Sequence, residues 1–162
     1  MASPSFMFFL VITLGTIVCD IDAAPTVVVA PKASEVPNVK LSVYYETLSP
    51  SSSWFIYFQL SLIFENGLID IIDLHLVPSG NARNNAIVCE HGEDEGFLNT
   101  VEACAIYLLP LDKHYPFLSC VGEYVKHENY NDEWIVCFEK TGMDETLIAD
   151  CVKSGVGHHV NT

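Results

Sequence analysis

The sequence predicts one α/β domain in which a β-α-β unit is followed by a run of helices. Three observations point to this fold class. A β-branched and aromatic run, an amphipathic run and a second apolar run follow one another between residues 39 and 77. After residue 96, apolar residues recur every three or four positions, which is the spacing of helices. The 162 residues are 50% hydrophobic, enough for the core of a single domain.

Residues 1–23 are expected to be a signal peptide that lies outside this domain. Phe6 to Cys19 is an uncharged apolar stretch of 14 residues, too short to span a bilayer. Cleavage is expected near Ala23, with a cut just after Cys19 as the alternative and an uncleaved anchor or a buried helix as the competing interpretations. Residues 24–38 hold three prolines and are expected to be a flexible leader. The mature protein is therefore expected in the secretory pathway, either secreted or lysosomal/vacuolar.

The β-α-β unit is predicted over residues 39–77. Val39 to Tyr45 alternates and favours a strand. Ser49 and Pro50 then begin a helix, because Ser49 is expected to accept a backbone N–H bond as N-cap and proline fits the first helical position. The helix is expected to end at Asn66-Gly67. Leu68 to Val77 is predicted to be a second strand, parallel to the first.

Four amphipathic helices are predicted in the second half of the chain. Their apolar faces carry one cysteine each, namely Cys104, Cys120, Cys137 and Cys151. Thiols of an exported protein are oxidised in the secretory pathway, so interhelical disulfides are expected, although the sequence does not choose the pairing. Cys89 lies in the loop before these helices. It is expected to remain a free thiol or to link two chains as a dimer.

The acidic composition excludes two classes of partner. The formal net charge is −14, and loss of residues 1–23 would leave 19 acidic against 7 basic residues, or −12. Nucleic acids and anionic membranes both attract cationic surfaces, so neither is an expected partner. No membrane association is expected after signal cleavage. An acidic, solvated surface that serves only solubility is the favoured explanation of this charge.

The run from Cys89 to Cys104 contains the most informative pattern in the chain. Its fixed positions are Cys89, His91, Gly92, Glu95, Asn99 and Cys104. This pattern resembles the signature of the gamma-interferon-inducible lysosomal thiol reductase (GILT) family, except that Gly96 stands where the family has a cysteine. The runs DLHL at Asp73–Leu76 and VEACAI at Val101–Ile106 strengthen the resemblance, which extends over about residues 39–157. It implies a thioredoxin-like fold with a helical insertion, and reduction of disulfides in unfolded or disulfide-bonded proteins at acidic pH.

By this resemblance, Ser49 and Ser52 occupy the places of the nucleophilic and resolving cysteines. A helix N-terminus stabilises a thiolate, but a serine hydroxyl stays protonated and cannot form a mixed disulfide. We therefore expect an impaired thiol-disulfide oxidoreductase, in effect a pseudoenzyme. No Gly-x-Ser-x-Gly elbow surrounds Ser49, which disfavours a hydrolase. The alternatives are a non-catalytic secreted binding protein and a non-functional truncated product.

The resemblance also implies a length difference. Family members continue with a strand preceded by a cis-proline, a hairpin partner and a final helix, whereas this sequence ends at Thr162. We therefore expect the domain at residues 39–157 to be incomplete at its C-terminal side, with two strands of a partial thioredoxin-like fold.

No cofactor and no metal are predicted. His91 is a candidate base or metal ligand, but a lone histidine beside Gly92 more often holds a turn. His75 is expected on the polar face of its strand, and His158 and His159 in a terminal tail. Glu93, Asp94 and Glu95 are expected to form a solvated acidic start to a helix, favourable with its dipole.

Overall fold

The computed structural model describes residues 38–79, 81–83, 86–125 and 132–156. The predicted signal peptide and nearly all of the predicted leader lie outside the described residues, as do His158 and His159. No helix within the described ranges is long and apolar enough to cross a membrane.

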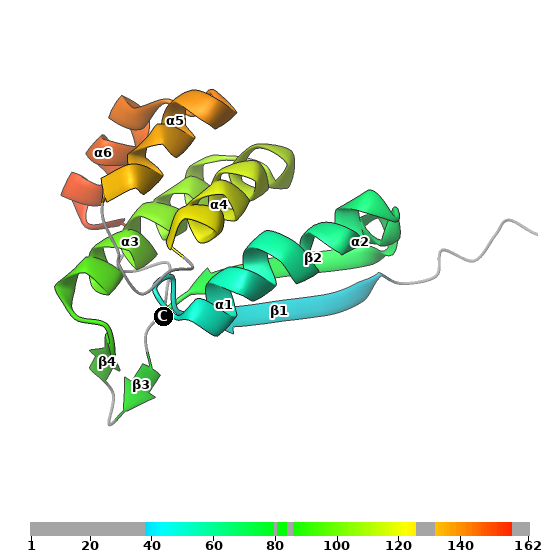
Figure 1. Cartoon of the computed structure of the whole chain (residues 1–162), viewed down its shortest axis with the longest axis horizontal. Coiled ribbons are helices and arrows are strands. Elements are labelled where there is room, and N and C mark those ends of the chain that lie inside the picture. The colour runs from blue at the N-terminus through cyan, green and yellow to red at the C-terminus, as the bar shows by residue number, and fades with distance from the viewer. Residues whose placement is uncertain (1–37, 80, 84–85, 126–131, 157–162) are drawn as a thin grey trace, which may run out of the picture. The chain divides into compact units, whose positions relative to one another are not determined.

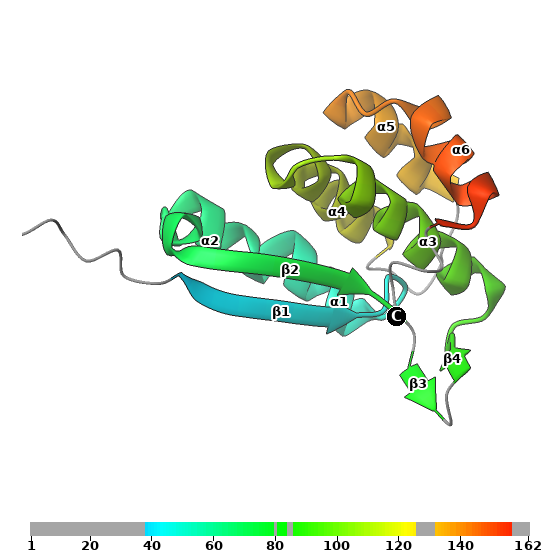
Figure 2. The ribbon, with the colours of Figure 1, turned by 180° about the vertical axis from the view of Figure 1, so that it is seen from behind.

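The β-α-β unit begins with strand β1 (Val39–Tyr45) and ends with strand β2 (Ile72–Pro78), which pair in parallel from Val39↔Ile72 to Tyr45↔Pro78. The helical connection consists of α1 (Pro50–Trp54), a π-helical segment η1 (Phe55–Gln59) and α2 (Ser61–Glu65). These helices run along one face of the two strands (Figure 1), and the opposite view shows the strands in front of them (Figure 2). The predicted α/β fold with a β-α-β unit is confirmed.

Two features of the fold, one in this unit and one just after it, differ from the prediction. Residues 68–71 were expected to begin the second strand, but Leu68–Ile71 forms a 3₁₀ helix, η2, and β2 starts at Ile72. Gly67 has a φ of 76°, a left-handed conformation that ends the helix and leads into this turn. β1 begins at Val39, which pairs with Ile72, so residues 68–71 have no partner strand among the described residues. The second difference is a short antiparallel hairpin of β3 (Asn81–Arg83) and β4 (Ala86–Val88), whose strands are too short to give a sequence periodicity.

The predicted helical second half is confirmed. Its elements are α3 (Glu93–Leu108), α4 (Leu111–Val125), η3 (Asp132–Ile135), α5 (Val136–Thr141) and α6 (Glu145–Ser154). The Asp144 side chain caps α6 by accepting hydrogen bonds from the backbone N–H groups of Thr146 and Leu147. Gly142 and Gly155 are the C-cap residues of α5 and α6.

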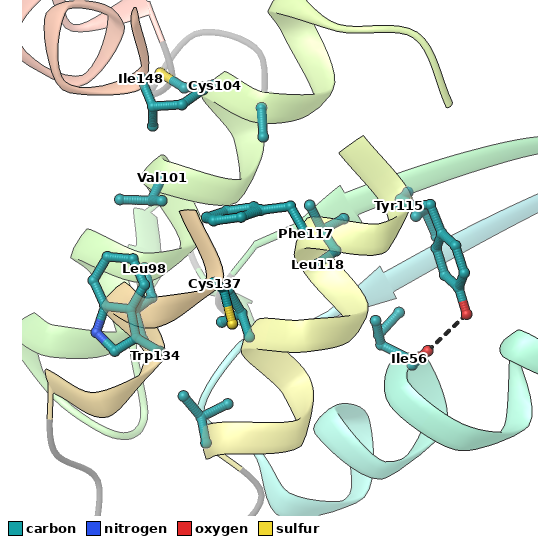
Figure 3. Close-up of a cluster of buried hydrophobic side chains, with 14 of the residues drawn as sticks. Ile56, Leu98, Val101, Cys104, Tyr115, Phe117, Leu118, Trp134, Cys137 and Ile148 are labelled. Carbon is teal, nitrogen blue, oxygen red and sulfur yellow. Dashed lines mark hydrogen bonds between the residues drawn. The ribbon is translucent and has the colours of Figure 1, made fainter. Parts of the chain in front are cut away.

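One hydrophobic core joins both halves of the described chain. Leu98, Phe117 and Leu118 are fully buried at its centre, and Ile56 extends it to the helical connection (Figure 3). The Tyr115 hydroxyl donates a 3.1 Å hydrogen bond to the backbone oxygen of Ile56, so α4 is fixed to η1 (Figure 3). Because of this shared core, the β-α-β unit and the helices form one packed unit.

Candidate functional site

The N-terminus of α1 holds the two serines that the sequence analysis singled out. Ser49 is the N-cap residue by its backbone, with φ −69° and ψ 120°, and its carbonyl oxygen accepts a 2.9 Å bond from the Ser53 N–H. Its hydroxyl, however, makes no capping hydrogen bond, so that part of the prediction is wrong. The Ser49 Oγ instead lies 3.1 Å from the Ser51 Oγ, in an exposed hydroxyl pair. Pro50, the first residue of the helix, favours a helix start at this position, and the Ser49 side chain does not contribute to it.

The loop that carries Ser49 is fixed by Asn99 of the signature. The Asn99 Oδ1 accepts hydrogen bonds from the Thr47 N–H at 3.0 Å and from the Thr47 Oγ1 at 2.6 Å. The Ser53 hydroxyl in turn donates a 2.8 Å bond to the backbone oxygen of Thr47. Thr47, Ser53 and Asn99 are all buried. This network joins α3 to the start of α1, and it explains what Asn99 does in the fold.

A second polar contact joins the same elements. The Tyr45 hydroxyl at the end of β1 donates to the Glu102 Oε2, and both side chains are buried. Burial raises the pKa of Glu102 to about 8, although the Tyr45 hydrogen bond acts in the opposite direction. Burial and the nearby Glu102 charge also raise the pKa of Tyr45, which therefore stays a hydrogen-bond donor.

The signature loop leads into α3 through Gly92. Gly92 has a φ of 86°, a left-handed conformation that favours glycine, and its N–H donates to the Cys89 carbonyl at 3.3 Å. The turn brings Cys89 back toward the first turn of α3. A Cβ atom placed on Gly96 would lie 3.2 Å from the Cys89 Sγ. The residue at 96 is therefore placed where a cysteine could bond to Cys89, and glycine leaves that thiol without this partner.

Cys89 is a free cysteine in the described chain, and its side chain is partly buried. Burial raises its pKa, and the Glu95 and Glu46 carboxylates raise it further. A thiol with a raised pKa is protonated at neutral and acidic pH and is a poor nucleophile. The surroundings of Cys89 thus oppose the activation that a redox cysteine needs.

His91 and Glu95 lie one helical turn apart and contact each other. The His91 Nδ1 and the Glu95 Oε2 are within hydrogen-bond distance. Glu93 and Asp94 are exposed as expected, but Glu95 is 0% exposed, so its expected place in a solvated acidic turn is wrong. Its burial depends on the contact with His91, which forms only when the signature loop folds back onto α3.

The four helical cysteines form two disulfides. Cys104 of α3 is bonded to Cys151 of α6, and Cys120 of α4 to Cys137 of α5. These bridges are the interhelical use expected of the four residues. Since all four are bonded, the described chain contains no pair of thiols that could alternate between reduced and oxidised forms.

Several residues of this site were not found by sequence reasoning. Tyr45, Glu46, Thr47 and Glu102 were never singled out as polar site residues. A signal was present on α3, where Glu95, Asn99 and Glu102 follow one another at spacings of four and three, on the face that also buries Leu98. Polar residues at helical spacing on a buried face indicate a polar network inside the fold.

A separate apolar cavity of about 390 Å³ lies among α3, η3, α5 and α6. Phe97, Trp134 and Val152 contribute to its lining. Phe97 is 49% exposed, and its ring centroid lies 6.3 Å from that of Trp134 in an edge-to-face arrangement. Asp132, Glu145 and Lys153 are the charged residues of its otherwise apolar lining. The polar site at the end of β1 and at the signature loop is therefore the stronger candidate.

Comparison with known proteins gives a consistent result. The sequence model of the family described as Gamma interferon inducible lysosomal thiol reductase (GILT) matches residues 40–141. Over 118 residues the chain is 41% identical to the "Gamma-interferon-responsive lysosomal thiol protein" of Arabidopsis thaliana, covering 70% of this chain and 48% of that protein. Over 125 residues it is 38% identical to the "Gamma-interferon-inducible lysosomal thiol reductase" of Mus musculus, covering 72% of this chain and 42% of that protein. The matched part thus spans less than half the length of each of these relatives.

Proposed function

Since this chain belongs to the gamma interferon inducible lysosomal thiol reductase family, we propose that it is a member impaired in thiol-disulfide exchange. The observation that carries the proposal is the pair of serines at the start of α1. Ser49 is the N-cap of that helix and Ser52 lies within its first turn, at the places where the family resemblance puts the two redox cysteines.

The chemistry of exchange requires a sulfur at the first of these positions. A thiolate attacks a substrate disulfide, and a covalent mixed disulfide forms before the second thiol resolves it. A serine hydroxyl offers neither the anion nor the sulfur-sulfur bond. The Ser49 hydroxyl faces the hydroxyl of Ser51, which is not a general base.

No other cysteine of the described chain supplies the missing chemistry. Four are held in two disulfides between helices, and Cys89 has its pKa raised by burial and by two carboxylates. A single thiol with a raised pKa supports neither fast attack nor resolution. The polar network around Thr47 and Asn99 nevertheless keeps the loop before α1 in place.

The same proposal covers location and partners. Disulfides between helices and the family of lysosomal relatives suit a protein of the secretory pathway, secreted or lysosomal. Its partners would be unfolded or disulfide-bonded proteins, bound without being reduced, or a second copy linked through Cys89.

The direct test is reduction of insulin with a dithiol donor, from about pH 4.5 to about pH 7. We expect the purified chain to give no more turnover than its Ser49→Ala variant. Turnover clearly above that control would contradict the proposed impairment. A family member that is active as a thiol reductase, assayed beside it, shows that the conditions support the reaction.

A further inference from the structure

Three potential metal ligands from distant parts of the sequence meet beside the loop that leads to α1. Glu46 follows β1, whereas His91 and Glu95 belong to the signature loop and the first turn of α3. One ligand atom from each of the three lies within 4.8 Å of the other two. We propose that Glu46, His91 and Glu95 form a binding site for a divalent transition metal, with zinc as the best fit.

The Glu95 carboxylate gives the independent reason for a ligand at this place. Its side chain is 0% exposed, and its Oε2 contacts the His91 Nδ1. Its second oxygen, Oε1, has no hydrogen-bond partner among the described residues. A buried carboxylate oxygen that accepts nothing is costly, and buried charges in proteins are usually paired or coordinate metals. The exposed acids Glu93 and Asp94 in the same turn carry no such requirement.

The donor atoms of the three groups fit a divalent cation. Two of the groups are carboxylates and the third is an imidazole, so the cluster offers oxygen and nitrogen ligands. The contact with His91 is made by the Glu95 Oε2 and leaves Oε1 without a hydrogen-bond partner among the described residues. A metal ion held by the three side chains would give that buried oxygen a partner.

The donor set selects among metals. Calcium and magnesium prefer sites made of oxygen atoms alone, whereas an imidazole nitrogen suits zinc and its transition-metal neighbours. One nitrogen and two carboxylate oxygens leave the fourth position of a tetrahedral zinc ion for water or another ligand. No metal was predicted from the sequence, since His91 alone is a weak signal and Glu46 lies 45 positions before it in the chain.

The test is to measure zinc binding by the purified protein with titration calorimetry, at a pH of about 7.5, above the ordinary pKa of histidine. Glu95→Gln removes the buried charge and keeps the side-chain size. Glu93→Gln makes the same change at an exposed position of the same helical turn and is the matched control. We expect one zinc ion per chain, at least about a tenfold loss of affinity in Glu95→Gln, and no more than about a twofold change in Glu93→Gln.

Because Glu95 is buried, its variant could lose the fold together with the metal. His91→Gln is therefore measured beside it, since the His91 side chain is 40% exposed and its replacement disturbs the core less. The circular dichroism spectrum of each variant shows whether it is folded. We expect folded His91→Gln to lose zinc affinity as Glu95→Gln does. The proposal is overturned if the wild-type chain binds no zinc, or if folded His91→Gln binds as tightly as wild type.

Discussion

The Tyr45 hydroxyl donates a 2.5 Å hydrogen bond to the Glu102 Oε2, across 57 positions of the sequence. The bond joins the last residue of β1 to the middle of α3, and both side chains are buried. A carboxyl group in such a place is stable when it is neutral. Burial accordingly raises the pKa of Glu102 to about 8, which makes this contact sensitive to pH.

The first prediction is that Glu102 makes the fold more stable in acid. Its pKa in the folded state, about 8, lies above the ordinary value of 4.5. The folded protein therefore holds a proton that the unfolded chain releases, and the stability from this group is lost as pH rises from about 4.5 to about 8. The slope is at most about 1.4 kcal/mol per pH unit. The Glu102→Gln variant, which stays neutral, should lose less stability between pH 5 and 7.5 in urea unfolding.

His114 acts in the opposite direction, so the comparison between variants matters. Burial lowers the pKa of His114, and this group therefore costs stability as pH falls below its ordinary value of 6.5. The difference between wild type and Glu102→Gln removes this shared contribution. The exposed Glu139→Gln is the matched control and should keep the wild-type slope. Equal slopes in all three proteins would show that Glu102 is not responsible.

The second prediction concerns the start of α1. With Cys89→Ser removing the native free thiol, Ser49→Cys should place a thiol where the helix dipole favours its anion. Ser154→Cys, at the last residue of α6, places the control thiol at the opposite end of a helix. The thiol pKa, taken from the pH dependence of iodoacetamide labelling, should be lower at position 49 than at position 154. The reverse order would mean that the N-terminus of α1 does not activate a thiol.

The third prediction is that Gly96→Cys forms a disulfide with Cys89. The Cβ position on Gly96 lies 3.2 Å from the Cys89 Sγ, a separation that a bridge can use. The variant should show no free thiol by alkylation and intact mass, and its loop of eight residues should add about 2.5 kcal/mol of stability. Gly96→Ser serves as the control for the added side chain. A variant with two reactive thiols after air oxidation would contradict the predicted geometry.

The fourth prediction is uneven protection from hydrogen exchange. α3, α4, α5 and α6 bury their faces in the core and are joined by two disulfides, each worth roughly 2–4 kcal/mol. β1 pairs with β2 alone in the described chain, and Val39 and Tyr44 are 61% and 73% exposed. Amides in Val101–Leu108 and Val121–Val125 should therefore exchange slowly, and those in Val39–Tyr45 faster. Strong, equal protection in both regions would indicate that something covers the strands.

The sequence predicted the elements of this fold better than its polar site. Alternation at Val39–Tyr45 and helical spacing after residue 96 reflect local geometry, so they can be read without knowing the fold. Glu95 and Glu102 could not be placed in this way. A carboxylate on a helix normally faces water, and its burial here depends on partners that the fold brings together, namely His91 and Tyr45. Ser49 shows the converse, since its position was predicted correctly while its hydroxyl bond was not.

The Cys104–Cys151 disulfide brings two Cα atoms to 5.9 Å although 47 positions separate them. The Cys120–Cys137 bridge lies entirely inside this interval. The bridge therefore closes residues 105–150 into a covalent loop, which leaves α3 at Cys104 and returns to it at Cys151. The neighbouring ends of this interval allow its length to change without redirecting the chain on either side, provided that Phe117 and Leu118 keep their places in the shared core. Asn99 lies before the interval and holds the loop at Ser49 independently of it.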